Sequence, residues 1–344
     1  MPPPIFPPDR RPPFDAQSRW INLWGHVAHA RAVRTFRKHL RYLPNIAFPT
    51  TYHEKMLWRR VFDHDPAFAR FCDKLETKSI FAALDPPIAT APTLWTGTDP
   101  RDLPDDLFGP GIVVKCNAGS RRNWFAGEAP DRAAFEAEAR RWMAKPFGTK
   151  NSEWAYRSVD RRIYAERMLA PDRRALDELK IHMIGGEVYF TVVYREENTP
   201  TSKSALFDAD GRRLAVRNSM ARIRPERRLP PDYRLPDCYP QALAAARTLA
   251  RGRDYVRVDF FVIDGRLHGG EITVYPTAGL MTNSHPDVIA DMSRRWDLRR
   301  SWFCSTPQMG WRENYRQRLV AWCEARFENE LPPVDLPLEL ADGV

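Results

Sequence analysis

Cysteines are few in this sequence, and their placement suits neither pairing nor metal binding. The five cysteines among 344 residues are widely scattered and never occur in Cys-x-x-Cys spacing. A disulfide framework usually needs an even number of cysteines, and structural zinc sites use closely spaced pairs. The sequence therefore indicates neither a disulfide-stapled scaffold nor a zinc site, and we expect reduced, mostly buried thiols.

Long hydrophobic runs are also missing. No stretch approaches the roughly 20 apolar residues that a membrane-spanning helix requires. The N-terminal stretch MPPPIFPPDRRPPF has no apolar core of the kind found in signal peptides. Hydrophobic residues make up 43% of the chain and charged residues 28%, as in ordinary soluble proteins. We therefore expect a cytoplasmic protein, with enough chain for two or three lobes.

Acidic residues are outnumbered by basic ones, 44 against 53, which leaves a formal net charge of +9. An excess of positive charge favours an anionic partner such as a nucleotide, an anionic glycan, a nucleic acid or a lipid headgroup. Arginine pairs are dispersed along the chain, whereas nucleic-acid-binding proteins usually concentrate basic residues in one patch with interleaved aromatics. We therefore expect no stable complex with nucleic acid.

The first 110 residues favour helices and loops. Residues 1–18 are rich in proline and predict a flexible or polyproline II arm. Residues 20–42 predict a single helix with one basic side, which fits either a solvated face or a helix at a membrane surface. Residues 85–110 predict connecting loops. Helices are expected in three further places: from the N-cap Thr51 to Phe62, after Asp65-Pro66, and from Cys72-Asp73.

The remainder of the chain alternates strand and helix signals. Apolar alternation interrupted by glycine pairs or Asp-Gly predicts hairpins, and alanine-rich or amphipathic segments bounded by Asp, Pro or Gly predict helices. The expected strands are 111–116 and 162–169, the expected hairpins are 178–196 and 205–216, and the expected helices are 131–143, 240–252 and 310–327. Residues 328–344 are acidic and expected to be loose.

One predicted hairpin, residues 255–279, organises the candidate chemistry. Its β-branched and aromatic residues flank an Asp264-Gly265 pair, which suits a tight turn. Asp259 and Glu271 lie inside its two strands, and twelve residues and one turn bring them close across an antiparallel pair. Because a buried, unpaired carboxylate is costly, both acids need a partner. A hard cation shared with phosphate oxygens, as when Mg²⁺ is bound with ATP, would satisfy them.

A second candidate element joins a strand to a small, polar turn. The segment GIVVKCNAGSRRNW, residues 111–124, is an apolar strand that reaches Lys115 before the turn. This arrangement directs a lysine and several backbone N–H groups to one place, as phosphate cradles do. The Walker signature GxxxxGK[ST] is absent, so the segment is not a P-loop. A solvated lysine at the end of a strand remains an equal alternative for Lys115 alone.

Four stretches together resemble one protein family. They are PTTYHEKMLWRRVFDHDPAFARFCDK, VVKCNAGS, ELKIHMIGGEVYF, and the pair RVDFF with GEITVYPTAG. In this order and spacing they resemble the TupA-like ATP-grasp proteins, which are named for a protein of teichuronopeptide biosynthesis in bacterial cell envelopes. The resemblance covers roughly residues 44–300. Its most specific part is RVD, followed by a strand of nearly fixed length and GE-x-T.

The resemblance implies an α+β ATP-grasp fold, in which two α+β lobes hold ATP between antiparallel sheets, with an added helical N-terminal region. It implies this division of the chain: a proline-rich arm and basic helix in 1–43, a helical region in 44–110, a small lobe with the phosphate loop in 111–169, a large lobe with the metal site in 170–305, and a C-terminal helix and tail in 306–344. ATP-grasp enzymes generally activate a carboxylate as an acylphosphate, which an amine or another nucleophile then captures.

The resemblance also implies roles for individual residues, with ATP and Mg²⁺ as cofactors. Ala118 stands where the common phosphate loop has histidine, so Arg121 or Arg122 is expected to cover the phosphates instead. The implied catalytic residues are Lys115, Lys180 and Arg257. The implied ATP contacts are Lys115, Asn117, Gly119, Ser120, the hinge residues Glu166, Arg167, Met168 and Leu169, Glu178 and Lys180. The implied metal ligands are Asp259, Glu271 and Thr273, where many family members carry asparagine in place of Thr273.

The function that follows is an ATP- and Mg²⁺-dependent ligase that joins a carboxylate to an amine, acting on a cell-surface polysaccharide or its precursor, with peripheral contact to envelope-synthesis machinery. Two alternatives stay open. The same cleft would serve a kinase of a sugar or glycan hydroxyl, and a degenerate cleft would leave a non-catalytic glycan- or nucleic-acid-binding protein. His182 and His268 are expected to be structural, whereas Asn283, Ser284 and His285 fit either a substrate contact or an ordinary polar loop.

Overall fold

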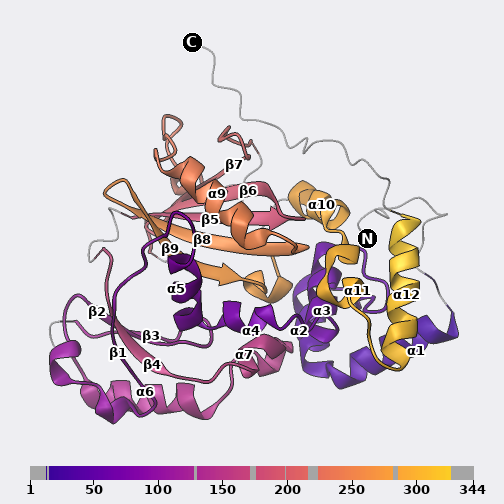
Figure 1. Ribbon diagram of the computed structural model, residues 1–344, viewed down its shortest axis with the longest axis horizontal. Helices are drawn as coiled ribbons and strands as arrows, with labels where there is room; N and C mark the ends of the chain where they lie inside the picture. The colour runs from indigo at the N-terminus through magenta and orange to yellow at the C-terminus, as the bar shows by residue number, and fades with distance from the viewer. Residues whose placement is uncertain are drawn as a thin grey trace.

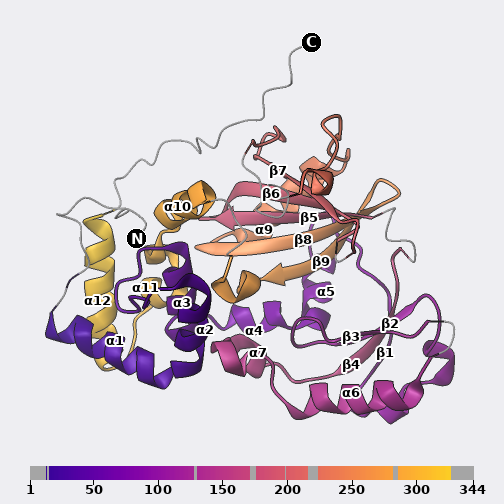
Figure 2. The ribbon, with the colours of Figure 1, turned by 180° about the vertical axis from the view of Figure 1, so that it is seen from behind.

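Two antiparallel β-sheets form the frame of the molecule, and a group of helices packs beside them (Figure 1). The computed structural model describes residues 13, 15–127, 130–170, 176–197, 199–215, 224–281 and 286–326. In views from opposite sides, the helix α5 (Lys74–Ala82) lies between the two sheets (Figures 1 and 2). Backbone from both lobes therefore meets around this helix.

The larger sheet has five strands in the order β7-β6-β5-β8-β9. Its members are β5 (Asp177–Ile184), β6 (Glu187–Arg195), β7 (Lys203–Phe207), β8 (Tyr255–Ile263) and β9 (Arg266–Thr273). The hairpins β5–β6 and β8–β9 confirm two predictions. The third predicted hairpin is reduced to an isolated bridge between Phe207 and Arg213, while β7 pairs mainly with β6. Helix α9 (Tyr239–Ala250), also predicted, packs on β5, β6 and β8.

The smaller sheet has four strands in the order β1-β4-β2-β3. They are β1 (Thr93–Gly97), β2 (Ile112–Cys116), β3 (Asn123–Phe125) and β4 (Ile163–Arg167). The predicted strands 111–116 and 162–169 are confirmed, as is the helix capped by Asp131, α6 (Arg132–Ala144). The prediction of loops throughout 85–110 was wrong, because β1 extends along β4 there. Since β1 lies outside the proposed small lobe of residues 111–169, we now propose that this lobe begins at β1.

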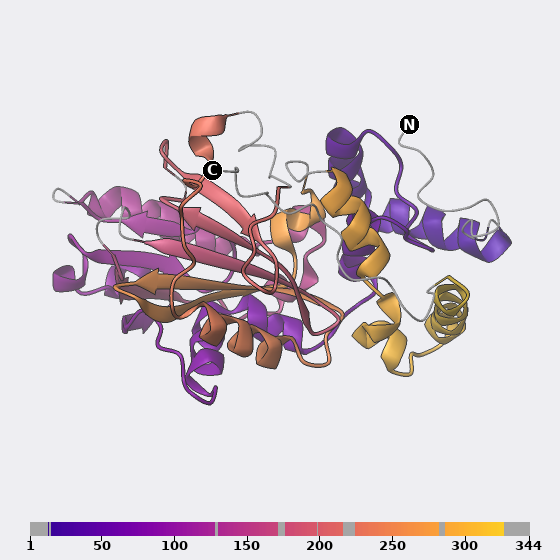
Figure 3. The same cartoon turned by 90° about the horizontal axis from the view of Figure 1, so that it is seen from above.

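The N- and C-terminal parts of the chain meet in one helical group beside the sheets, which is clearest from above (Figure 3). The pattern of 20–42 predicted one helix, but the chain breaks at His29 into two, so this prediction was wrong in detail. The helices of the group are α1 (Ala16–Ala28), α2 (Ala30–Leu40), α3 (Tyr52–Val61), α10 (Pro286–Arg295), α11 (Trp302–Ser305) and α12 (Trp311–Glu324). Within the described ranges, no helix has both the length and the apolar character needed to cross a bilayer.

Helix α3 is the buried centre of the helical group. All ten of its residues are buried, although half of them are histidine, glutamate, lysine or arginine. The predicted N-cap Thr51 is confirmed: its hydroxyl accepts from the Glu54 amide, and Glu54 completes a capping box. Helices α4 (Ala67–Cys72) and α5 follow, with Asp73 accepting from the amides of Leu75 and Glu76. This run of helices carries charged groups from the helical core to the sheets.

Candidate functional site

The hairpin β8–β9 forms one wall of the candidate site. Asp259 and Glu271 are direct cross-strand partners, as the sequence predicts. One extra residue, Gly270, makes a bulge beside them, because Phe260 pairs with Gly269. A Cβ on Gly270 would lie 2.8 Å from the Asp259 carbonyl oxygen, so only glycine lets the two strands approach this closely. The bulge therefore fixes the position of the Glu271 side chain relative to Asp259.

Arg257 holds the Asp259 carboxylate from the same strand. Its Nε donates to Oδ1 at 2.7 Å and its Nη2 donates to Oδ2 at 2.6 Å, a bidentate arrangement. The same Nη2 lies 3.3 Å from the Thr273 hydroxyl oxygen. Burial raises the pKa of Asp259, and the charges of Arg257 and Lys180 oppose that rise only in part. The implied catalytic arginine and two implied metal ligands are thus gathered in one contact network.

Glu271 has a different partner, Lys74, at the start of α5. The Lys74 Nζ lies 4.0 Å from a Glu271 carboxylate oxygen and donates to the Gly119 carbonyl at 2.6 Å. Burial alone would raise the pKa of Glu271, but Lys74 and Arg257 outweigh it, and the pKa is lowered. Lys74 was not among the predicted site residues. It links β9 directly to the predicted phosphate loop.

These side chains offer oxygen donors of the kind that Mg²⁺ prefers, but few of them. Among the described residues, no group of three or more His, Cys, Asp or Glu side chains is placed to hold a metal. Two carboxylates and one hydroxyl fit a cation that takes its remaining ligands from water and phosphate oxygens, which is the usual coordination of Mg²⁺ at nucleotide sites. The donor set of Asp259, Glu271 and Thr273 therefore fits a magnesium ion bound together with a nucleotide.

Lys180 sits on the neighbouring strand β5, directly opposite Asp259. Its Nζ donates to Glu197 at 2.6 Å and lies 3.5 Å from Glu178. The pKa of Glu178 lies well above its usual range, mainly because the side chain is buried and also because Glu197 hydrogen-bonds to it. Glu197 was missed by the sequence analysis. It follows β6, and only the pairing of β5 with β6 brings it beside Lys180.

The opposite wall comes from the smaller sheet and from α5. Lys115 and Lys78 both contact the nearly buried carboxylate of Glu166, Lys78 at 2.6 Å. Lys115 and Glu166 lie on β2 and β4, two strands that the sequence predicted and that pair with each other in the structure. Lys78 was missed, although it lies one helical turn after Lys74, so the two lysines of α5 share one face. Two ammonium groups around one carboxylate leave this wall with an excess of positive charge.

The predicted phosphate loop is held rigidly at its beginning. Asn117 is fully buried; its amide nitrogen donates to the Asp160 carbonyl at 3.0 Å, and its side-chain oxygen accepts from the Arg162 amide at 2.8 Å. The Asn117 side chain is therefore engaged in positioning the loop, and its assignment to the phosphate loop stays a prediction. Gly119 has φ +115°, and a Cβ there would meet the Phe147 ring at 2.8 Å. Ser120 is exposed beyond it.

Arg122, after the phosphate loop, and the hinge residues at the end of β4 bond to neighbouring backbone carbonyls. Arg122 donates to carbonyls at the end of α6, Trp142 at 2.9 Å and Lys145 at 2.8 Å. These contacts hold the Arg122 guanidinium at the end of α6, and the expectation that Arg121 or Arg122 covers the phosphates stays a prediction. The hinge residues Glu166, Arg167, Met168 and Leu169 leave the smaller sheet at the end of β4, where the amides of Arg167 and Met168 donate to the carbonyls of Pro92 and Gly111.

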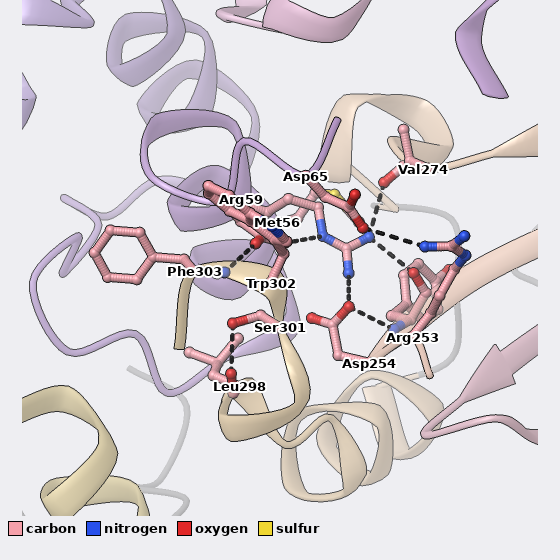
Figure 4. A network of polar contacts seen from close by, with 12 residues as sticks. Met56, Arg59, Asp65, Arg253, Asp254, Val274, Leu298, Ser301, Trp302 and Phe303 are labelled. Atoms are coloured by element: carbon pink, nitrogen blue, oxygen red, sulfur yellow. Dashed lines mark hydrogen bonds and ion pairs between the residues drawn. The ribbon is translucent and has the colours of Figure 1, made fainter. Parts of the chain in front are cut away.

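A buried arginine of α3 bonds to both strands of the hairpin β8–β9, at the end away from the turn (Figure 4). Arg59, fully buried, donates to the carbonyls of Tyr255 at 2.9 Å and Val274 at 3.1 Å. It also donates to Asp254 at 2.5 Å, whose second oxygen accepts from Trp296 at 2.7 Å. Tyr255 begins β8, and Val274 directly follows β9. Arg59 was missed because nothing in its own helix marks it as different from its basic neighbours.

Directly after β9 the backbone is strained. Thr277 and Ala278 have φ values of +49° and +52°, and Gly279 continues the left-handed turn at +73°. Non-glycine residues in this region cost of order 1 kcal/mol or more each. The buried His53 of α3 bonds to the Gly279 carbonyl oxygen through Nδ1 at 2.7 Å, which holds the turn in place. Asn283, Ser284 and His285 lie outside the described residues.

His182 and His268, both expected to be structural, have different partners. His182 is buried, shares a hydrogen bond with the Tyr255 hydroxyl at 2.9 Å, and has a pKa well below the ordinary value, mainly because of burial. Such a histidine is neutral and structural. His268 bonds weakly, through Nδ1, to the Arg266 carbonyl at 3.2 Å on the same strand.

Comparison with known proteins identifies the family. The family described as TupA-like ATPgrasp matches residues 54–290, more than half of the chain. No curated protein sequence matches. Similar solved structures include a D-alanine–D-alanine ligase from Bacillus anthracis complexed with ATP, at 17% identity and a TM-score of 0.36, covering 65% of this chain and 67% of the ligase. They also include an N5-carboxyaminoimidazole synthase from Aspergillus clavatus complexed with ADP and its ribonucleotide, at 16% identity and a TM-score of 0.34, covering 66% of this chain and 53% of that protein.

A third similar structure is the ATP-grasp ligase PsnB with a minimal precursor, at 11% identity and a TM-score of 0.33, covering 76% of this chain and 64% of PsnB. The chain thus spans between about half and about two thirds of the length of these structures. The predicted α+β ATP-grasp fold is confirmed, with two antiparallel sheets on either side of α5.

Proposed function

Because the chain belongs to the TupA-like ATP-grasp family, we propose that it is an ATP- and Mg²⁺-dependent ligase that joins a carboxylate to an amine through an acylphosphate. The observation that carries the proposal is the meeting of two unlike walls at α5. Lys78 and Lys115 gather at Glu166 on one side, and Arg257, Asp259 and Glu271 gather on the other. Lys74 contacts both the metal strand and the phosphate loop.

The proposed residue roles follow from these contacts. Lys78 and Lys115 would hold ATP phosphates, and the backbone around Gly119 and Ser120 would close over them. The side chains of Asp259 and Glu271, with Thr273, would hold Mg²⁺. When bound, Mg²⁺ supplies positive charge to the phosphate oxygens. Lys180, which lies across from Asp259, would compensate the charge that develops on the transferred phosphoryl group.

The proposed chemistry balances in two steps. An oxygen of the substrate carboxylate bonds to the γ-phosphorus, the bond from that phosphorus to the bridging oxygen breaks, and ADP leaves. An amine nitrogen then bonds to the acyl carbon, phosphate leaves with the acyl C–O bond electrons, and the amine loses a proton. Arg257 is placed to hold the acyl oxygen as negative charge builds on it, while its present contact with Asp259 keeps it oriented.

We further propose that the substrate is a cell-surface polysaccharide or its precursor and that the enzyme works at the cytoplasmic side of envelope synthesis. Two things support this proposal: the family's namesake acts in teichuronopeptide biosynthesis, and the net charge of +9 suits an anionic glycan. The carboxylate would then come from an acidic sugar or an amino acid, and the amine from the other partner.

Hydroxylamine trapping tests the reaction type. The full-length protein is incubated with Mg²⁺, ATP, hydroxylamine and a panel of uronic acids and amino acids. The proposal predicts carboxylate-dependent ADP release together with a hydroxamate. A phosphorylated sugar formed without a hydroxamate would instead select a kinase. ATP turnover that yields neither ADP nor a trapped acyl group would refute the ligase proposal.

A further inference from the structure

The N-terminal helix pair, α1 and α2, exposes an apolar stripe next to basic residues, with no acidic residue among them. On α1, Trp20, Leu23 and Val27 are 48%, 64% and 70% exposed. Their spacing of three and four residues places them on one face of the helix. Leu43, just after α2, is 56% exposed. Exposed large apolar side chains are normally scattered singly over a protein surface. Four of them within 24 residues of this helix pair therefore indicate a contact surface.

A second chain segment extends the apolar stripe. The Trp311 ring at the start of α12 packs edge-on against Trp20, with ring centroids 5.0 Å apart. Two residues before it, Met309 is 88% exposed. Among the described residues, Phe125 is the only other large hydrophobic side chain with comparable exposure. Exposed apolar residues are therefore concentrated at this end of the helical group, which lies beside the sheets (Figure 3).

The charged side chains of the helix pair are all basic. From residue 16 to residue 53 the sequence contains no aspartate or glutamate. The exposed side of α2 and the residue after it carry Arg31, Arg34, Arg37, Lys38 and Arg41, while Val33 and Phe36 on its other side are buried. None of these five cations forms an ion pair within the part of the chain that the structure describes. Asp15, at the start of α1, is paired with Arg318.

We propose that this helix pair, residues 19–43, is a docking surface for an anionic lipid bilayer. A helix that lies in a membrane interface buries tryptophan and aliphatic side chains among the headgroups and uses adjacent lysine and arginine to bind anionic lipids. Val27 near the end of α1 and Arg31 near the start of α2 are both exposed on either side of the turn at His29, so apolar and basic side chains adjoin in the chain. A nucleic acid would use the arginines but has no use for exposed leucine and valine.

The docking surface is separate from the proposed catalytic walls. None of its residues contacts α5, β2 or the hairpin β8–β9 through a hydrogen bond or ion pair within the described residues. Membrane docking therefore goes beyond the proposed ligase function, and the two can fail independently. Docking would place the enzyme where lipid-linked or surface-bound substrates are assembled.

Vesicle sedimentation tests the docking surface. The full-length protein is mixed with vesicles of phosphatidylcholine alone, or with about one third phosphatidylglycerol. We expect binding to the anionic vesicles to exceed binding to the neutral ones by about tenfold or more, and to fall when salt shortens the Debye length from about 10 Å at 0.1 M to about 3 Å at 1 M.

Two variants separate lipid binding from simple charge attraction. The double variant Leu23→Ser/Val27→Ser changes only exposed side chains and leaves the charge unaltered, so it should fold normally and lose about tenfold in anionic-vesicle binding. Arg34→Glu/Lys38→Glu should lose at least as much. The matched control Arg251→Glu/Arg266→Glu changes two exposed arginines outside the helix pair and lowers the net charge by the same amount as Arg34→Glu/Lys38→Glu. It should bind like wild type.

Three outcomes would overturn the proposal. Equal binding to neutral and anionic vesicles would remove the role of charge. Undiminished binding by Leu23→Ser/Val27→Ser would remove the role of the apolar stripe. Tighter binding to soluble polyphosphate or single-stranded DNA than to anionic vesicles, unaffected by that double variant, would assign the surface to a polyanion.

Discussion

The two walls that meet at α5 neutralise their charges in opposite ways. On the smaller sheet, one nearly buried carboxylate, Glu166, is shared by the two lysines Lys78 and Lys115. On the larger sheet, each of the two facing carboxylates has its own nearest cation: Arg257 for Asp259 and Lys74 for Glu271. Two lysines at one carboxylate suit a phosphate group, and two neighbouring carboxylates offer the oxygen ligands that a divalent cation prefers. This difference is the basis for our proposal that phosphate binds to one wall and Mg²⁺ to the other.

The walls also differ in what supports them. The larger sheet's wall is braced from behind by Arg59, which reaches both strands of the hairpin from α3. The smaller sheet's wall is braced by backbone contacts around Asn117. Disturbing one brace should therefore affect one wall and leave the other in place.

Removing Arg59 should produce the largest effect. Arg59→Met leaves Asp254 buried without its cation, and breaking a buried pair from one side typically costs about 3–5 kcal/mol of stability. The control Arg70→Met removes a surface pair with Glu76, which is worth about 0–1 kcal/mol. Urea unfolding measures both variants. Equal stability of the two variants would contradict the assigned role of Arg59. Arg59→Met/Asp254→Asn should recover part of the loss.

Neutralising Glu271 should have the next largest effect, which turnover measurements will show. Glu271→Gln keeps the size of the side chain but removes a charge from the metal wall, so ADP release should fall about 10²–10³-fold, as for loss of one preorganised electrostatic group. The control is Glu187→Gln, on the exposed β5–β6 turn, where the side chain is 81% exposed. Turnover is measured across a range of Mg²⁺ concentrations, and a variant that matches wild type at all of them would exclude Glu271 as a metal ligand.

Removing one lysine from the smaller sheet's wall should weaken nucleotide binding. Lys78→Met or Lys115→Met deletes one charged donor, which is worth about 1.5–3 kcal/mol, or about 10- to 100-fold in affinity. Unlike the effect of Glu271→Gln, this loss should persist when Mg²⁺ is chelated, because phosphate contacts on this wall need no metal. Calorimetry with ADP measures it. The exposed Lys145→Met serves as control, and unchanged affinity in both site variants would contradict the assignment.

The smallest effects should be opposite pH dependences of two acids on the larger sheet's wall. Glu178 has a raised pKa in the fold, so its contribution to stability is present below its unfolded pKa of about 4.5 and is lost as pH rises through the folded value. Glu271 has a lowered pKa, so its contribution is present above about 4.5 and is lost as pH falls through the folded value. Urea unfolding across this pH range checks both signs.

For Glu178→Gln, the stability relative to wild type should increase with pH above about 4.5, because the unfavourable ionisation is removed. For Glu271→Gln, the stability relative to wild type should instead decrease as pH rises toward about 4.5, because the favourable ionisation of Glu271 is missing. A shift of the same sign in both variants would show that the two carboxylates are not held differently.

The sequence allowed much of the larger sheet's wall to be predicted, and less of what surrounds it. Asp259 and Glu271 could be paired because a hairpin with a recognisable turn fixes which residues face each other. Lys115 could be found because it ends a clear apolar strand. These signals are local, and local spacing survives in the fold.

The residues that were missed act across long chain separations. Arg59 and Tyr255 are nearly 200 positions apart, and Lys78 and Glu166 are 88 apart. On α3 and α5 these cations look like any other residue of a charged helix, and only tertiary packing selects them. Asn117 shows the converse: its place in a phosphate-loop motif suggested a ligand contact, but backbone partners at residues 160 and 162 occupy both of its side-chain polar atoms.

Calorimetric titration with ADP, with and without Mg²⁺, tests most directly whether the two walls form one nucleotide site with separate duties. Wild type should bind ADP more tightly with Mg²⁺. Glu271→Gln should keep metal-free binding and lose the Mg²⁺ enhancement, whereas Lys115→Met should lose affinity in both conditions. Failure of wild type to bind ADP, or an undiminished Mg²⁺ enhancement in Glu271→Gln, would contradict the assignment of phosphate to one wall and metal to the other.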